Sequence, residues 1–188
     1  MPAIGYAPRG ERRERDMAIP ERISWSIGHL EIGPGERILE IGCGRGVALA
    51  EISRLLVDGR IVGLDRSDSA VGAAIERNAE AIAAGKAEIV QSTLADYSAP
   101  NGTFGKIFAI NVNLFWLEAM RELAVLKPLL AAGGRLFLFF EPPSAGQIDT
   151  IRRAIEVRLK AAGYSVDKVV YGPTSKPPLL GIITRPST

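Results

Sequence analysis

Apolar residues along this chain gather in short runs of strand character, which alternate with longer segments whose apolar residues recur at helical spacing. Strands are predicted over residues 37–41, 61–65, 87–91, 106–111 and 134–140, and helices over residues 46–57, 68–84, 115–127 and 145–162. Strands that alternate with helices build a parallel sheet with helices on both faces. The pattern therefore predicts an α/β fold with a doubly wound, mostly parallel sheet.

Glycine and proline mark the expected ends of two helices. The alanine-rich helix over 68–84 is expected to end at Gly85. The helix over 115–127 is expected to stop at Pro128, ahead of the Gly133–Gly134 pair, because proline cannot continue a helix.

The pattern changes beyond Gly163, where two strands follow one another without a helix between them. They span residues 164–171 and 179–184 and are joined by the turn-rich sequence GPTSKPP. The chain is therefore expected to end in a β-hairpin.

One predicted strand runs directly into a glycine-rich turn. Residues 37–46 read RILEIGCGRG, and a helix is expected to begin near Val47. Glycine has no side chain and permits positive φ, so the backbone can approach a ligand closely, and the helix start offers unpaired N–H groups. Glu40 is a carboxylate in an otherwise apolar strand. This combination is typical of α/β proteins that bind a nucleotide-like ligand.

The spacing of the glycines separates two ligand classes. A dinucleotide fingerprint reads GxGxxG, and its third glycine would fall at Val47 when counted from Gly42. The chain reads GxGxG instead, with Glu40 two residues before the first glycine. A nicotinamide-dependent oxidoreductase is therefore the less favoured alternative.

The next strand ends in an acid at Asp65, about 20 residues beyond the glycine turn, where α/β nucleotide sites place a carboxylate against the ribose hydroxyls. A carboxylate accepts two charge-assisted hydrogen bonds at once, which suits two neighbouring hydroxyls. The alternative is that Asp65 caps the helix that starts near Ser67 or Asp68. Together with the glycine turn, the ribose role is the preferred interpretation.

The acid followed by GxGxG resembles the first motif of the class I S-adenosylmethionine-dependent methyltransferases. The resemblance covers most of the chain from about Glu36, and it is strongest in the strings EIGCGRG and VGLDRS. It implies a Rossmann-like sheet of seven strands, in which the seventh lies antiparallel beside the fifth, and S-adenosyl-L-methionine as the cofactor. The cofactor-binding positions that we carry over are Glu40, Gly42, Cys43, Gly44, Asp65, Arg66, Thr93, Leu94 and Asn111.

The chain departs from the family pattern after the third strand. The family often has an aspartate there that bonds the adenine, and the matching position is Thr93. Either Asp96 replaces that aspartate from further along the loop, or backbone groups and Thr93 alone hold the adenine. Asn111 and the aromatic pair Phe115-Trp116 resemble the pattern of methyltransferases that act on small molecules, with Phe115 in place of a histidine. Enzymes that methylate amino groups of nucleic acids have a Pro-Pro pair after the asparagine, and none follows Asn111.

Three residues are expected on the acceptor side, namely Asn113, Trp116 and Glu141. Trp116 either lines the pocket or packs in the core, and Glu141 either orients the acceptor or is a solvated loop acid. Three tyrosines are further candidates that the sequence does not position: Tyr6, Tyr97 and Tyr171. His29, the single histidine, is expected to pack rather than to act as a base, so no catalytic residue is assigned.

Composition agrees with a small enzyme that acts on a small-molecule acceptor. The 188 residues carry a net charge of +2, which gives no argument for a nucleic-acid partner. Cys43 is the single cysteine, so an intrachain disulfide is excluded, and neither a signal peptide, a membrane span nor a metal site is predicted. A cytoplasmic protein is expected, and no oligomeric state is assigned.

The chain is expected to consist of an N-terminal arm, residues 1–36, and a methyltransferase domain, residues 37–188. Ile19, Ile23, Ile27 and Leu30 recur in the arm at near-helical spacing. The arm is expected either to pack on the edge of the sheet or to close over the donor site as a lid. A protein that binds S-adenosylmethionine without turnover is the second alternative function.

Overall fold

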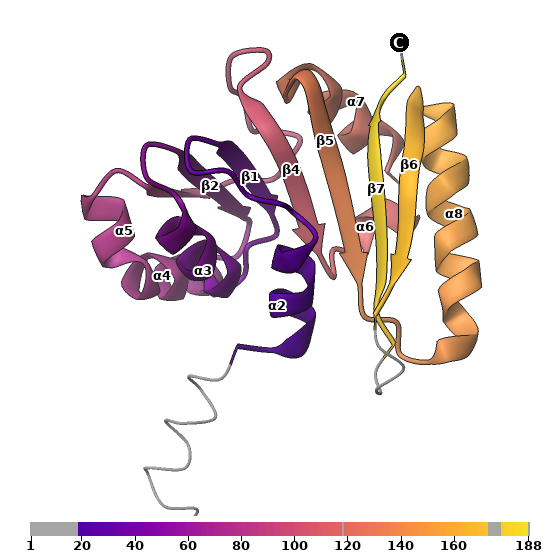
Figure 1. The fold of residues 1–188 in the computed structure, drawn as a ribbon, viewed down its shortest axis with the longest axis horizontal. Coiled ribbons are helices and arrows are strands. Elements are labelled where there is room, and N and C mark those ends of the chain that lie inside the picture. The colour runs from indigo at the N-terminus through magenta and orange to yellow at the C-terminus, as the bar shows by residue number, and fades with distance from the viewer. Residues whose placement is uncertain (1–18, 118, 173–177, 188) are drawn as a thin grey trace, which may run out of the picture.

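The computed structural model describes residues 19–117, 119–172 and 178–187, and these form a seven-stranded sheet (Figure 1). The strand order is β3-β2-β1-β4-β5-β7-β6. The strands are β1 (Arg37–Ile41), β2 (Arg60–Asp65), β3 (Ala87–Gln91), β4 (Phe104–Ile110), β5 (Leu130–Phe140), β6 (Tyr164–Tyr171) and β7 (Leu180–Pro186). The first five are parallel, and β7 lies antiparallel between β5 and β6. The predicted doubly wound fold with its antiparallel C-terminal strand is confirmed.

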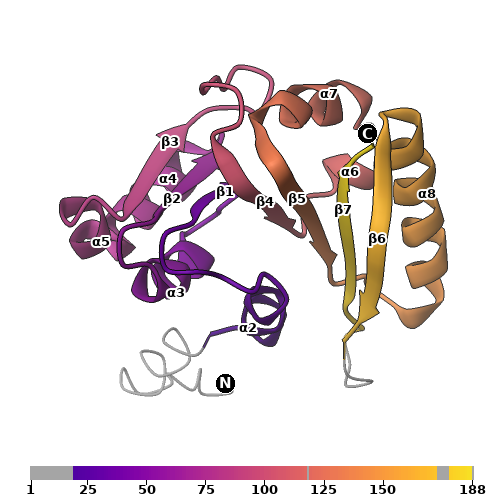
Figure 2. The ribbon, with the colours of Figure 1, turned by 45° about the horizontal axis from the view of Figure 1, so that its top comes forward.

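Helices cover both faces of the sheet (Figure 2). One face carries α2 (Glu21–Gly28), α3 (Val47–Leu55), α4 (Asp68–Arg77) and α5 (Ala79–Ala83). The other carries α6 (Leu114–Leu117), α7 (Met120–Leu129) and α8 (Ile148–Ala161), which follows the short 3-10 turn η1 (Ala145–Gln147). The sheet is thus the central layer of three.

Alternate residues of each inner strand pack into two separate cores, because successive side chains point to opposite faces of the sheet. In β1, Ile38 packs with the helices of the first face, whereas Leu39 and Ile41 pack with those of the second. All three are at most 5% exposed. This burial on both faces is why β1 reads as a nearly continuous apolar run.

The predicted helix over 68–84 is interrupted at Asn78, which separates α4 from α5. The buried side-chain amide of Asn78 donates to the carbonyl oxygens of Ala74, at 2.8 Å, and Gly46, at 3.0 Å. The second of these bonds ties the end of α4 to the glycine turn. Asparagine disrupts the helix here because its side chain competes for backbone hydrogen bonds.

Two expected boundaries after β4 are wrong. Pro128 does not stop the helix, since α7 runs to Leu129 with the proline in its last turn. The Gly133–Gly134 pair lies inside β5, which starts at Leu130, and the pairing of β4 with β5 is irregular at this point. A Cβ at Gly134 would meet the carbonyl oxygen of Ala131 at 2.9 Å, so these glycines allow an irregular strand rather than end a helix.

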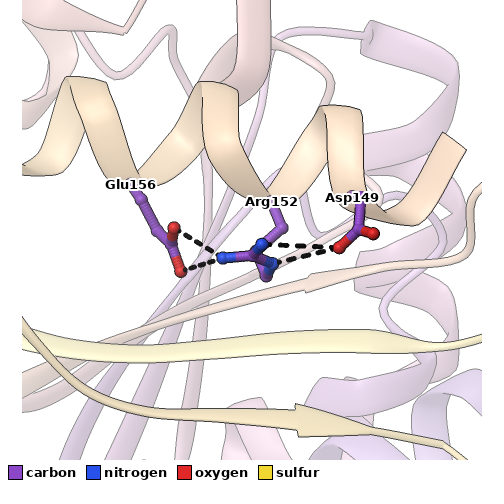
Figure 3. A network of polar contacts seen from close by, with 3 residues as sticks. All are labelled: Asp149, Arg152 and Glu156. Carbon is purple, nitrogen blue, oxygen red and sulfur yellow. Dashed lines mark hydrogen bonds and ion pairs between the residues drawn. The ribbon is translucent and has the colours of Figure 1, made fainter.

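Helix α8 shows how an amphipathic segment covers the sheet. Ile151, Ile155 and Leu159 are buried on one side. Figure 3 shows Arg152 between two acids of the same helix, with Glu156 Oε2 at 2.7 Å from Nη1 and Asp149 Oδ1 at 3.4 Å from Nη2. The hydrogen bonds to Glu156 raise the pKa of Arg152 and outweigh the lowering caused by burial.

The described part of the N-terminal arm packs on the sheet through α2 and the residues after it. Leu30 is fully buried in the same core as Ile38, and Ile23, Trp25 and Ile27 pack against that core. Residues 1–18, including Tyr6, lie outside the described residues, as do residues 173–177 of the segment between β6 and β7.

The topology brings the candidate residues to one edge of the sheet. Because β1 to β5 are parallel, their carboxyl ends meet at the same edge, where the glycine turn follows β1 and Asp65 ends β2. Ligands of open α/β sheets bind outside this edge. Among the described residues, β3 and β4 are joined by a loop without a helix.

Candidate functional site

The three glycines of the turn adopt left-handed backbone conformations, with φ of 69° at Gly42, 52° at Gly44 and 69° at Gly46. A Cβ at Gly42 would lie 2.7 Å from Cγ2 of Val112, and one at Gly46 would lie 2.4 Å from Nδ2 of Asn78. Those two glycines are therefore required by packing as well as by backbone conformation.

Gly44 is different, because a Cβ at this position would meet nothing within 4 Å. Its backbone N–H donates to Oδ2 of Asp65 at 2.8 Å, which joins the turn to the end of β2. Helix α3 begins at Val47, and no side chain caps its first turn. The space beside Gly44 is therefore open to a ligand that can use the N–H groups of the helix start.

Asp65 holds two backbone segments at once. Oδ2 accepts from Gly44 as described, and Oδ1 accepts from the N–H of Ser67 at 2.9 Å. The N-cap of α4 is Ser67, whose hydroxyl accepts from the N–H of Ala70 at 3.4 Å. Asp65 is thus not the capping residue, and its carboxylate keeps further acceptor capacity for a ligand.

Glu40 is the most unusual acid of the described residues. It is 4% exposed, and its Oε2 has no hydrogen-bond partner among them. Burial raises the pKa of Glu40 well above its usual range, and the negative charge of Asp65 raises it further. Without a cationic partner, the side chain is therefore favoured in its neutral form.

Cys43, within the glycine turn, is 6% exposed. Burial raises the pKa of its thiol to about 12, and the charges of Glu40 and Asp65 act in the same direction. The thiol is therefore protonated at neutral pH, which excludes it as a thiolate nucleophile.

A cavity of about 700 Å³ opens beside the glycine turn, within the range of small-molecule and cofactor sites. Six of the residues selected from the sequence line it: Gly42, Asp65, Arg66, Thr93, Leu94 and Asn113. The other six do not appear in its wall, and all of them except Glu141 lie on segments that line it: Glu40, Cys43, Gly44, Asn111, Trp116 and Glu141.

The cavity wall also contains residues to which the sequence assigned no individual role. Val112, Leu114 and Leu117 supply apolar surface, and Glu122 supplies a carboxylate from the first turn of α7. Leu117 is 52% exposed, which is high for a leucine, and lining a cavity accounts for this exposure. Their position after β4 was the available signal, since the carboxyl end of this parallel strand faces the site.

The loop after β3 has its own local structure. The hydroxyl of Thr93 donates to Oδ2 of Asp96 at 2.6 Å and accepts from the N–H of Asp96 at 3.3 Å. Thr93 lines the cavity of the glycine turn, whereas Asp96 lines a second cavity of about 500 Å³.

The segment after β4 begins with a strained residue. Asn111 has φ of 56°, and its Oδ1 accepts from the backbone N–H of Glu141 at 2.7 Å. Trp116 donates through Nε1 to Oδ1 of Asn113 at 3.4 Å, and its ring packs against the core. Phe115, in the position of the family's histidine, is 1% exposed.

Glu141 forms an ion pair with Arg22 of α2, with Nη1 and Oε2 3.2 Å apart. The pair joins the N-terminal helix to the end of β5. Glu141 is therefore a partnered, partly exposed acid rather than a free loop carboxylate.

The remaining candidates lie away from the cavity wall. The ring of His29 packs on Trp25, with centroids 4.7 Å apart, and burial followed by the charge of Lys168 lowers its pKa. Tyr97 lines the second cavity, and Tyr171 is 54% exposed on β6.

The described part of the chain contains no cluster of three or more His, Cys, Asp or Glu side chains placed to hold a metal ion. None of its helices has the length and apolar character needed to cross a membrane.

Comparisons with known proteins agree with the geometry of the site. Residues 38–134 match a family model described as a methyltransferase domain. The chain is 22% identical over 144 residues to YdaC, an uncharacterised methyltransferase of Bacillus subtilis (strain 168), with 74% of this chain and 77% of the relative covered. It is 24% identical over 136 residues to the O-methyltransferase cnsE of Penicillium expansum, covering 72% of this chain and 49%, about half, of that protein.

The fold is also similar to that of solved methyltransferase structures. A solved structure of a SAM-dependent methyltransferase from Aquifex aeolicus superposes with a TM-score of 0.73 at 19% identity, covering 92% of this chain and 96% of that one. The residues that match the family model, 38–134, span more than half of this chain and include the glycine turn, Asp65 and the cavity wall. The chain therefore belongs to the family of proteins that carry this methyltransferase domain.

Proposed function

We propose that this protein transfers a methyl group from S-adenosylmethionine to a small-molecule acceptor. The observation that carries the proposal is the cavity at the carboxyl ends of β1 and β2, which Gly42 and Asp65 line, together with the open space beside Gly44 in the adjoining turn. The family supports methyl transfer as the reaction class, and the Aquifex relative is described as SAM-dependent.

The residues present fit the two ends of this donor. Gly44 leaves space for the amino-acid end, and the uncapped start of α3 would receive it, because the backbone N–H groups of a helix start suit its carboxylate. Glu40 would face the ammonium group, which supplies the partner that its buried Oε2 lacks. Asp65 would accept hydrogen bonds from the ribose hydroxyls.

The adenine would lie against the apolar part of the cavity. Leu94 is 6% exposed and belongs to the wall, as do Arg66 and Thr93. Thr93 uses its hydroxyl to hold Asp96, so its side chain shapes the loop, while backbone groups of the same loop remain to bond the base. We therefore infer that shape and backbone contacts, rather than an aspartate, recognise the adenine.

Charge complementarity supports a cationic donor. S-adenosylmethionine carries one net positive charge, from its sulfonium, ammonium and carboxylate groups. Glu40 and Asp65 are two acids on adjacent strand ends of the site, and a cation beside a carboxylate favours the charged form of both. The bound donor supplies a methyl group already activated by its positive sulfur.

The protein's part in the reaction is then to position the acceptor and exclude water. No covalent enzyme intermediate is needed, and the protonated thiol of Cys43 does not provide one. On the acceptor side we place Asn113, Trp116 and Glu141, with Arg22 of α2 at the border through its ion pair with Glu141. This border is where the proposed lid role of the arm would act.

A small-molecule acceptor is favoured for two reasons. The net charge of +2 shows no excess of cations suited to a nucleic acid. One curated relative is named an O-methyltransferase, which makes a hydroxyl the first acceptor group to test.

The test is to incubate the purified protein with S-adenosylmethionine and a metabolite library of alcohols, phenols, carboxylic acids and amines. S-adenosylhomocysteine should accumulate only in the presence of an acceptor, with a mass gain of one methylene on that acceptor. Binding of the donor with no product across the library would favour the non-catalytic alternative. Binding of NADH without binding of either adenosyl compound would contradict the proposal.

A further inference from the structure

Asn111 combines three features that do not occur together elsewhere in the described residues. It has a left-handed backbone although it is not glycine, its side-chain oxygen accepts a hydrogen bond from the residue that follows β5, and the next residue packs on the glycine turn. Glu31 is the other described residue with positive φ that is not glycine. A non-glycine residue in this conformation costs about 1 kcal/mol and persists where its surroundings enforce it.

Two hydrogen bonds hold Asn111 in this conformation. Its backbone N–H donates to the carbonyl of Phe139 at 2.9 Å, which continues the pairing of β4 with β5. Its Oδ1 accepts from the N–H of Glu141 at 2.7 Å, one residue past the end of β5. Asparagine is suited to this role, because it tolerates the left-handed region and carries a short acceptor.

The turn at Asn111 sets the course of the residues that follow. Val112 comes to lie against Gly42, with its Cγ2 where a Cβ on that glycine would clash at 2.7 Å. Asn113 enters the cavity wall beside it and holds Trp116. With extended backbone at 111, the chain would leave β4 in a different direction, and this part of the wall would not form.

The same turn also touches the acceptor side. Oδ1 of Asn111 accepts from the backbone N–H of Glu141, and the carboxylate of Glu141 forms an ion pair with Arg22 of α2. One side chain therefore fixes the end of β4 relative to the end of β5, between the donor cavity and the border formed by α2.

We propose that Asn111 is a positioning residue: its left-handed turn and its bond to Glu141 place Val112 and Asn113 as a wall of the donor cavity. Asn111 then contributes to donor binding through Val112 rather than by direct contact. The inference rests on the proposed function, because it takes the cavity to be the S-adenosylmethionine site.

Three substitutions separate backbone strain from the side-chain bond. N111G relieves the strain but removes the acceptor, N111D keeps both the left-handed tendency and an acceptor oxygen, and N111A loses both. Binding of S-adenosylhomocysteine is measured by calorimetry, and the midpoint of thermal unfolding by circular dichroism. Glu31 gives the matched control for N111G, since E31G relieves the same kind of backbone strain outside the cavity wall.

N111G should unfold within a few degrees of the wild type but bind S-adenosylhomocysteine about tenfold more weakly, as expected for the loss of one hydrogen bond that fixes the wall. N111D should bind within about threefold of the wild type, and E31G should unfold within a few degrees of the wild type without changing affinity. N111A should be the weakest binder.

Wild-type affinity in N111G, or a loss in N111D as large as in N111A, would overturn the inference while leaving the proposed function intact. Absence of S-adenosylhomocysteine binding in the wild type would overturn the proposed function and, with it, the inference. If N111A does not fold, the comparison of N111G with N111D still decides between the outcomes.

Discussion

Replacing Asp65 by alanine tests the part of the site on which the donor assignment most depends. The carboxylate accepts from the N–H of Gly44 at 2.8 Å and from the N–H of Ser67 at 2.9 Å. A carboxylate has about four acceptor positions, so about two remain for the ribose hydroxyls. Losing these charge-assisted bonds should cost about 1.5–3 kcal/mol, or a roughly 10- to 150-fold weaker affinity for S-adenosylhomocysteine.

The same substitution also leaves two backbone N–H groups without their acceptor. Both lie near the surface, where water can replace the carboxylate, so D65A should lower the free energy of unfolding by about 1–2 kcal/mol. D68A is the matched control, because Asp68 is an exposed acid in the first turn of α4 and does not line the cavity. It should bind S-adenosylhomocysteine within about twofold of the wild type.

A ligand series then assigns the lost energy to the ribose. Calorimetry compares 5′-methylthioadenosine with its 2′-deoxy analogue, in the wild type and in D65A. The missing hydroxyl should weaken binding to the wild type about tenfold and leave binding to D65A nearly unchanged, because the two changes remove the same interaction. An equal effect of the missing hydroxyl in both proteins would refute the ribose role of Asp65.

Three further substitutions and one chemical test follow from the site. E40Q should bind S-adenosylhomocysteine more weakly than the wild type yet be the more stable protein. Because the pKa of Glu40 is raised in the folded state, the stability of the wild type falls as pH rises above the pKa of the unfolded chain, near 4.3. The stability advantage of E40Q in urea titrations should therefore grow with pH. G44A should lose about 1 kcal/mol of stability from its left-handed backbone and should bind the donor product less well, since its Cβ enters the open space. G46A should lose about 2–4 kcal/mol, because its Cβ would also clash with Asn78, and equal unfolding midpoints for the two glycine variants would contradict this ranking. Cys43 should react with iodoacetamide at pH 8 at least about a thousandfold more slowly than free cysteine, because little thiolate forms when its pKa is about 12, and a rate near that of free cysteine would show that the thiol is not buried.

The sheet could be predicted from the sequence because its inner strands are buried on both faces. Strand β1 has the predicted bounds, since its apolar run ends where the glycines begin. The antiparallel C-terminal strands were recognisable because no helical segment separates them. A strand that is buried on both faces is a continuous apolar run, and such a run is visible in a single sequence.

The errors came from interactions between segments distant in the sequence. Asn78 breaks a helix by bonding Gly46, 32 residues away, and nothing in the local pattern of 68–84 indicates that partner. The glycines of β5 read as a helix end, whereas they allow an irregular strand whose pairing with β4 is not visible in the sequence. Tertiary contacts override propensity in both cases.

The site could be predicted in part for the same reason. Gly42 and Asp65 lie in a local motif, and both line the cavity. Glu122 and Leu117 reach the cavity from α7 and α6, and neither belongs to a motif. The partners of Glu141 and Asn111 likewise come from contacts 119 and 30 residues apart, respectively.

Titration of the wild-type protein with S-adenosylhomocysteine, and separately with NADH, in a calorimeter tests the central claim most directly. The account predicts saturable heat with one equivalent of S-adenosylhomocysteine, competition by S-adenosylmethionine, and no heat with NADH. Saturable binding of NADH with none of either adenosyl compound would contradict it.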